Sequence, residues 1–319
     1  MRAAAILCLT VLLVGLPAGH AEAGSLDLTY HDWGVSFGNS KRLTGVRLNF
    51  RDTQVDQVNG VNLTLCAPND VEHARINGVA LGLMGPGAGE MRGVALGGLG
   101  AGAGQDLQGA MVGVLGAGVG QNSTGLLTAG LGAGVGGDAK GLVLSFVGAG
   151  VGEDATGLVV GGVGSGVGQN LVGASVGAVG AGVVGDVHGL LAAGLGVGEE
   201  IRSIAAAGVA VGAGERIIGL VLSPGIVGAG ESIGGIAVAG VAIAAPMVTG
   251  ISVAALNGLM FEDGGFRHVN EHMTGVSIGL YNSTRELHGI QLGLINSAAN
   301  SPANSPGWAR ILPLINVHL

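Results

Sequence analysis

A 16-residue unit recurs through this chain. Six successive units are each 16 residues long, and they open at Gly93, Gly109, Gly125, Gly141, Gly157 and Gly173. Looser units of about 14 to 18 residues open at Gly45, Gly60, Gly78, Gly189, Ile204, Gly219, Gly235, Gly250, Gly275 and Gly289, with one insertion after Asn257. About sixteen units therefore cover most of the chain. A fixed period of this kind is typical of a stack of small repeated elements.

The opening of each unit has the period of a strand. Positions two and four are usually Val, Leu or Ile, and positions one, three and five are small or polar, as in "GVAL" and "GLVL". A helix would carry several glycines in every two turns, each costing about 0.8–1 kcal/mol relative to alanine, so sustained helix is excluded. Collagen is excluded because there is no three-residue period.

Two corners are predicted in each unit. Position eight is glycine in the central units, as at Gly132, and asparagine in the last units, at Asn257, Asn282 and Asn296. Both residues accept positive φ at low cost, so we predict a corner with a left-handed backbone there. A valine at position 132 would then be strained. The second corner falls at polar unit ends such as "GQNST" and "GGDAK".

These features predict an all-β fold, a parallel β-solenoid of about sixteen coils with a 16-residue repeat. Parallel stacking of identical coils, about 4.8 Å apart, places the Val and Leu residues of successive units over one another in continuous apolar rows. The alternative is a transmembrane β-barrel, because 16 residues also hold one spanning strand of about 10 residues and a turn. Parallel pairing of consecutive units distinguishes the solenoid from the barrel.

The repeat also divides the chain. Residues 24–44 are predicted to cap the N-terminal end, 45–257 to form the glycine-rich solenoid, 258–274 to be an insertion loop, and 275–319 to hold the final coils and a C-terminal cap. A solenoid needs caps because its last coils would otherwise expose pairing edges. Most aromatic residues lie outside the glycine-rich array and are predicted to plug its ends: Tyr30, Trp33, Phe37, Phe50, Phe261, Phe266, Tyr281 and Trp308.

Residues 1–23 predict a secretory signal peptide. Arg2 is followed by an apolar run and then by "AEA", which is typical of a cleavage site, here after Ala23. The formal net charge of −8, with 13 basic residues, excludes the clustered cations that nucleic acid needs. The prediction is an exported protein with no nucleic-acid partner.

The two ends of the chain carry a resemblance. "GVSIGLYNSTRELHGIQLGLINSAAN" with "LPLIN" near the C-terminus, and "DWGVSFGNSKRLTGVRLNF" near the N-terminus, resemble an uncharacterised family of exported bacterial surface-repeat proteins. That family has "GLQLGLIN" units and a terminal "LPLIN" segment. The resemblance implies a location at the bacterial cell surface, in the outer membrane or outside the cell, and it implies no chemistry.

An interrupted row of acids raises the question of calcium. "AGAGQDLQG", "AGVGGDAKG" and "AGVGEDATG" resemble the Gly-x-Gly-x-Asp turns of calcium-binding β-rolls. Here the turn recurs every sixteen residues instead of nine, and asparagine replaces aspartate at Asn122 and Asn170. Turn formation is the preferred interpretation. A calcium-binding protein remains an alternative function, with four candidate ligands: Asp106, Asp138, Asp154 and Asp186.

The insertion contains "HVNEH", which fits H-x-x-E-H. On a helix this motif would place His268 and His272 on one face as zinc ligands, with Glu271 as a general base. The motif is short and lies beside "EDGG", so a solvated loop is the preferred interpretation. We predict no catalytic residue, no resident metal and no cofactor.

The preferred function is that of an exported, non-enzymatic structural or adhesive protein with an unknown surface or envelope partner. Recognition energy usually comes from aromatic and arginine residues, and the insertion brings Phe261, Phe266 and Arg267 together. These three residues are the predicted contact site. In the competing interpretation, the two phenylalanines fold down to cover neighbouring coils.

Overall fold

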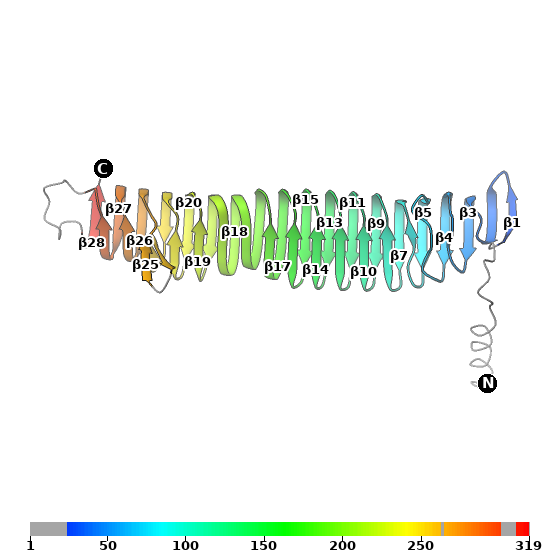
Figure 1. Cartoon of the computed structure of the whole chain (residues 1–319), viewed down its shortest axis with the longest axis horizontal. Helices are drawn as coiled ribbons and strands as arrows, with labels where there is room; N and C mark the ends of the chain where they lie inside the picture. Colours follow the sequence, from blue (N-terminus) through cyan, green and yellow to red (C-terminus); the bar gives the residue numbers. More distant parts are fainter. Residues whose placement is uncertain (1–23, 263–264, 301–310, 319) are drawn as a thin grey trace, which may run out of the picture.

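The computed structural model describes residues 24–262, 265–300 and 311–318, and it forms one straight rod (Figure 1). The predicted signal peptide, residues 1–23, and Trp308 lie outside the described residues. All regular structure in the described part is β-strand. No described segment forms a helix long and apolar enough to cross a membrane.

The described residues form twenty-eight strands, which follow one another in sequence. They are β1 Ser25–Tyr30, β2 Trp33–Gly38, β3 Arg42–Asn49, β4 Gln57–Thr64, β5 Arg75–Gly82, β6 Gly87–Ala88, β7 Glu90–Gly97, β8 Gly100–Ala103, β9 Leu107–Gly113, β10 Gly116–Val119, β11 Ser123–Ala129, β12 Gly132–Val135, β13 Ala139–Ser145, β14 Gly148–Val151, β15 Ala155–Gly161, β16 Gly164–Val167, β17 Leu171–Val183, β18 Val187–Ser223, β19 Ile226–Ala229, β20 Ser232–Ala239, β21 Ala242–Ala244, β22 Met247–Val253, β23 Leu256–Asn257, β24 Leu259–Glu262, β25 Gly265–His268, β26 His272–Thr284, β27 Glu286–Ala298 and β28 Ile311–His318.

Consecutive units pair in parallel, which confirms the solenoid. In the centre, Leu127 of β11 pairs with Met111 of β9 on one side and with Val143 of β13 on the other, a spacing of one unit each way. The short strands β10, β12 and β14 form a second parallel series in the same register. The barrel alternative is wrong, because its neighbouring strands would run antiparallel.

The core is a narrow strip between the long and the short strand of each coil. In the coil that opens at Gly125, the inward side chains are Leu127, Ala129, Ala133 and Val135, each 5% exposed or less. Positions two and four also form continuous aliphatic rows, but these rows lie on the outer surface, where Leu142 is 41% exposed. Each large aliphatic side chain buried inside contributes about 1.5–3 kcal/mol.

The left-handed backbone lies at position one, not at the predicted corner. Gly125 and Gly141 have φ values of 125° and 121°, and a Cβ at Gly141 would overlap the carbonyl oxygen of Gly125 in the coil below. The row continues through Ser203, whose φ is 139°, so that unit begins at Ser203 and not at Ile204. Gly132 is not among the residues of positive φ, and the prediction of a strained corner there is wrong.

The asparagines belong to a different row from the position-eight glycines. Asn257 pairs with Ile243, an inward residue of β21, and Asn282 and Asn296 continue the same buried row. Counted from the opening glycine, Asn257 is the eighth residue of its unit and its partner Ile243 is the ninth residue of the unit before. The path from the opening glycine to the short strand is therefore one residue shorter in the unit of Asn257, and equal positions in the repeat occupy different places in the coil. These asparagines therefore fill the core instead of forming a corner.

Both ends are capped by antiparallel strands. At the N-terminal end, β1 and β2 form a hairpin whose turn residues, His31 and Asp32, have positive φ. At the other end β28 runs antiparallel to β27, and Pro313 in β28 removes one backbone donor from the exposed edge.

The aromatic plug is wrong at the N-terminal end. Tyr30, Trp33, Phe37 and Phe50 are all exposed, with Tyr30 80% exposed. The reason is the register: Phe37 pairs with Leu48, which points outward, and the interior residues of these coils are Ser36, Arg47 and Asn62. Tyr281 near the other end is half-buried.

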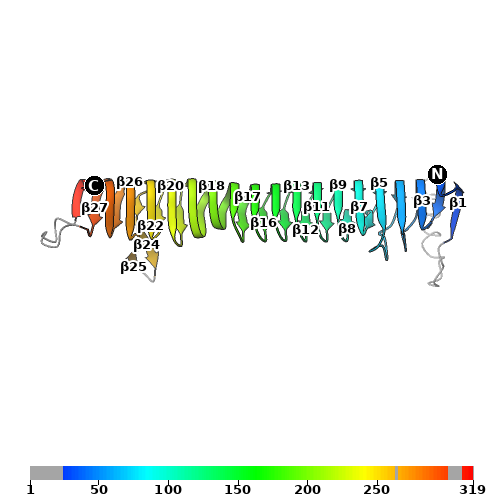
Figure 2. The ribbon, with the colours of Figure 1, turned by 90° about the horizontal axis from the view of Figure 1, so that it is seen from above.

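The insertion is a hairpin with its own two-stranded sheet. Strands β24 and β25 pair antiparallel and stand out from the rod in both views (Figures 1 and 2). Gly250 of β22 nevertheless pairs with Gly275 of β26, so the solenoid register continues across the insertion.

Candidate functional site: the acid row, the hairpin and a charged recess

The acid row forms a hydrogen-bonded ladder on one turn of the coil. The backbone N–H of Asn122 donates to Asp106 Oδ1 at 3.2 Å, and that of Asp138 donates to Asn122 Oδ1 at 3.2 Å. The ladder continues with Asp154 N to Asp138 Oδ1 at 3.2 Å, Asn170 N to Asp154 Oδ1 at 2.9 Å, and Asp186 N to Asn170 Oδ1 at 3.1 Å. Each side chain thus caps the backbone of the next coil.

The two asparagines in the row of aspartates have a local explanation. The Asn122 and Asn170 amides also donate to Asp106 and Asp154, each at 3.1 Å, so an asparagine interrupts the run of like charges. In every ladder member before Asp186, one side-chain oxygen already accepts a backbone N–H. Among the described residues, no three His, Cys, Asp or Glu side chains gather as a metal site.

The two histidines of H-x-x-E-H lie on different strands. His268 ends β25, and its Nδ1 lies 2.5 Å from Ser283 Oγ; His272 begins β26, and its Nδ1 lies 2.9 Å from Glu286 Oε2. Glu271 pairs instead with Arg285 at 3.3 Å. The helix that the zinc motif requires is not formed here, because the segment joins a hairpin to a coil.

The predicted contact residues lie on the hairpin. Phe261 of β24 pairs with Phe266 of β25, and Arg267 pairs with Met260, so the backbone brings them together at the end of the excursion. Their side chains are outside the described part of the structure. At its base the hairpin is tied to the rod, because Val269 N donates to Gly258 O and Gly258 N donates to Ile243 O, both at 2.9 Å.

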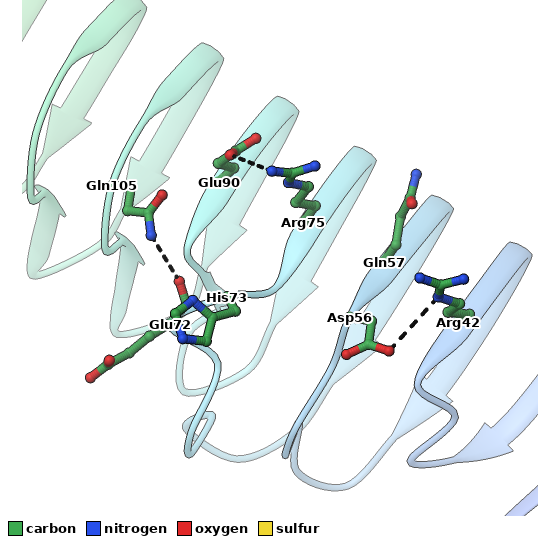
Figure 3. Close-up of a pocket in the computed structure, with 8 residues that line it drawn as sticks. All are labelled: Arg42, Asp56, Gln57, Glu72, His73, Arg75, Glu90 and Gln105. Carbon is green, nitrogen blue, oxygen red and sulfur yellow. Dashed lines mark hydrogen bonds and ion pairs between the residues drawn. The ribbon is translucent and has the colours of Figure 1, made fainter.

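A charged recess lies on the same turn as the acid row, toward the N-terminal end. Figure 3 shows it, and its volume is about 350 Å³. Arg42 Nε lies 3.7 Å from Asp56 Oδ2, and Arg75 lies 3.2 Å from Glu90 Oε1. Gln105 donates to the backbone oxygen of Glu72 at 3.3 Å. The recess can hold a polar ligand by charge, although both its arginines already have acid partners.

We did not predict this recess from the sequence. Arg42, Gln57, Arg75 and Glu90 each precede the opening glycine of their unit by three residues, so they stack in one row. An alignment of the units by their opening glycines would have placed these charges side by side.

The N-terminal coils also bury a charged network that the sequence did not reveal. Arg47 is fully buried and donates to Asp52 Oδ1 at 2.7 Å, Asn62 Oδ1 at 3.0 Å and Asn39 Oδ1 at 2.7 Å. Burial lowers the pKa of the Arg47 guanidinium, and the Asp52 carboxylate opposes that change. The charge is compensated by partners inside the protein, and the network does not face a ligand.

A second ionic cluster lies on β18. Arg202 donates to Glu200 Oε2 at 2.9 Å, and Arg216 Nε lies 3.2 Å from Glu200 Oε1. The hydrogen bond from Arg202 lowers the pKa of the Glu200 carboxyl, although burial acts in the opposite direction. Glu200 is therefore held ionised between two arginines of neighbouring coils.

Comparisons with known proteins do not extend these observations. No family model matches the chain, no curated protein matches it, and no solved structure matches it. The function of the chain is therefore inferred from the geometry of the rod and of its surface rows.

Proposed function

We propose that this chain is an exported, non-enzymatic surface protein whose solenoid serves as a rigid structural or adhesive element. The observation that carries the proposal is the parallel pairing of successive coils from β2 to β27, which makes a straight rod of about sixteen coils. At about 4.8 Å per coil the rod spans roughly 75 Å. Its ionic side chains in the acid row and on β18 are engaged in holding neighbouring coils together.

The hairpin β24–β25 is the proposed contact site. It is the excursion that leaves the rod in both views, and it carries Phe261, Phe266 and Arg267, which are residue types that supply binding energy at interfaces. The solenoid continues in register on both sides of it, so the hairpin is an addition to the rod and not one of its coils.

Export is tested by comparing the full chain with a version that starts at residue 24, each produced in bacteria with a C-terminal tag. We expect the full chain to be digested by protease added to intact cells and the shortened chain to be protected inside them. Equal protection of both would contradict export.

Adhesion is tested by replacing residues 260–267 with two glycines. The deletion stops before Asn270, because Asn270 O accepts a hydrogen bond from Arg285 N and belongs to the coil. We expect an unchanged melting temperature and a loss of binding to bacterial envelope material. The control is Phe146→Ser, which removes the exposed aromatic side chain of the array and should leave binding intact. If the hairpin deletion binds as the wild type does, the hairpin is not the contact site. A large loss of stability would instead show that the hairpin covers neighbouring coils.

A further inference from the structure

One side of the rod is apolar along its whole length. The turn between the long and the short strand carries exposed aliphatic or aromatic side chains in nearly every coil, and we call this row the apolar ridge. Its members are 45–68% exposed: Phe50, Leu65, Leu83, Leu99, Leu115, Leu131, Val147, Val163, Val179, Leu195, Val209, Val241, Leu280 and Leu294. Backbone hydrogen bonds join them into a ladder, for example Leu131 N to Leu115 O at 2.7 Å.

The rows at positions two and four extend the ridge onto the outer face of the long strands. From the unit at Gly60 to the unit at Gly289, no charged residue occupies position two, four, six or seven. The charges gather on the opposite turn, where the acid row lies: Asp106, Asp138, Glu153, Asp154, Asp186, Glu199, Glu215 and Glu231. The rod is thus apolar on one side, and its charged side is mostly acidic, with Arg75, Arg92, Lys140, Arg202 and Arg216 among the basic residues of the same units.

Beside the apolar ridge the surface is hollowed at two places, and together we call them the groove. Near the N-terminal end it has a volume of about 530 Å³, with Leu48, Leu63 and Leu81 on one wall and Phe50 and Leu65 on the other. The same place in the coil is hollowed again farther along the rod, with a volume of about 620 Å³, between Leu222 and Val238 on one wall and Pro224 on the other. Ridge and groove therefore lie side by side on one surface.

The apolar side is too large for a monomer and large enough for a stable dimer. From position two to position seven the surface is about 16 Å wide, and sixteen coils make it roughly 75 Å long, which gives about 1,200 Å². The largest apolar patch on a typical monomer is about 300–600 Å². Two such surfaces would bury about 2,400 Å², which falls in the range of homodimer interfaces, about 2,000–5,000 Å².

We propose that the apolar side joins two copies of this chain, with the apolar ridge of each copy seated in the groove of the other. This inference goes beyond the proposed function, because a rod could act at a surface alone or in pairs. A ridge beside a groove is self-complementary under a two-fold axis. The side chains also repeat about every 4.8 Å, and a second copy has the same repeat over the same length.

A lipid surface fits this side less well. Proteins that lie on membranes usually place Lys and Arg beside their apolar face and Trp or Tyr at its border. This chain has a net charge of −8 and only 3% aromatic residues, and its acids lie along the opposite turn. Pairing two apolar sides instead leaves both acid rows on the outside, facing water.

The experiment is sedimentation velocity on the purified protein over a range of concentrations. The test variant is Leu131→Lys with Val163→Lys, two exposed residues of the apolar ridge. Its matched control is Gln121→Lys with Gln169→Lys, two exposed residues of the acidic turn that receive the same added charge. We expect dimers for the wild type and the control, and a dissociation constant raised at least about 100-fold for the test variant.

The melting temperature of each variant shows whether the coils still form. If the lysine variant does not fold, Leu131→Ser with Val163→Ser makes the same test with a smaller change, and we expect it to weaken the dimer as well. A wild type that stays monomeric up to about 100 μM, or a folded ridge variant that dimerises like the control, would overturn the proposal. A monomeric wild type that floats with phosphatidylcholine vesicles would assign the apolar side to lipid. Export and hairpin binding are measured separately and do not depend on this result.

Discussion

The glycine that opens each unit adopts a backbone that other residues rarely adopt. Gly141 has a φ of 121°, and a Cβ there would overlap the oxygen of Gly125 in the adjoining coil. The glycines of the short strands differ, because a Cβ at Gly134 meets no atom within 4 Å and its φ is not positive. At the first position of the unit, both the backbone conformation and the packing require glycine. At Gly134 neither of them does.

We expect Gly141→Ala to lower the free energy of unfolding by at least about 2 kcal/mol, through strain at positive φ and through overlap with a backbone oxygen. Gly134→Ala is the matched control, and it should be neutral or stabilise by up to about 1 kcal/mol, because alanine loses less backbone entropy in a strand. Urea unfolding of both variants measures the difference. Equal effects would contradict this distinction between the two glycines.

At the level of the strands, polar ladders hold the coils together where the core is not apolar. Asn282 of β26 accepts a hydrogen bond from Asn257 at 2.8 Å, and its amide donates to Asn296 Oδ1 at 2.7 Å. Ser277 Oγ also donates to Asn282 Oδ1 at 2.9 Å. These groups are buried, so each hydrogen bond matters more than it would at the surface.

Asn282→Ala should destabilise the protein by about 2–4 kcal/mol, because it removes four hydrogen bonds of a buried side chain and leaves Asn296 Oδ1 without its donor. The control is Asn122→Ala in the exposed ladder, which should cost less than about 1 kcal/mol because water replaces the lost bonds. Chemical denaturation of both variants gives the comparison. Similar losses in the free energy of unfolding for the two variants would show that the buried ladder stabilises the protein no more than the exposed one does.

The cluster on β18 makes stability depend on pH. The pKa of Glu200 is lowered from its ordinary value of 4.5, so the stabilisation that its ionised form supplies is present above that value and is lost as the pH falls through the folded pKa. Glu200→Gln should therefore lower the melting temperature at pH 7 by about 2–5 °C. The difference between the two proteins should shrink as the pH falls from 4.5 and vanish below the lowered pKa of the folded protein.

Glu199→Gln is the control for this measurement, since Glu199 is the exposed neighbour of Glu200. It should melt like the wild type across the whole pH range. A melting difference for Glu200→Gln that stays constant into acid would contradict a role for the ionised carboxylate.

At the level of the whole molecule, the stack repeats each surface position in a row. The acid row from Asp106 to Asp186, the apolar ridge and the opening glycines are three such rows, and each has one chemistry along many coils. A property of one coil is thereby multiplied, whether it is charge, apolar area or backbone hydrogen bonding. This is how a chain with few large side chains presents extended surfaces.

The acid row should bind calcium weakly or not at all, because one oxygen each of Asp106, Asp138 and Asp154 accepts a backbone N–H from the next coil. We expect the melting temperature measured in millimolar calcium to differ from that measured in EDTA by no more than about 1–2 °C. This difference corresponds to a few tenths of a kcal/mol. A large EDTA-sensitive stabilisation would identify the row as a metal site after all.

The sequence alone determined the period, the strand character and the parallel stack. A unit that repeats every sixteen residues places equal residues over one another only if the coils are stacked, and glycine at this frequency excludes helix. Counting positions in the unit also groups the aspartates into one row and marks the segment after Asn257 as an insertion.

Only the tertiary structure decided which side of each strand faces inward. Leu126 and Leu127 are both apolar, so alternation could not choose between them; packing against Ala133 and Val135 of the short strand buries Leu127 and leaves the row of Leu126 outside. The asparagines moved into the core because one turn is a residue shorter, which shifts every later position by one. Both outcomes depend on contacts between strands that are separated by turns, and the order of residues within a unit does not specify those contacts.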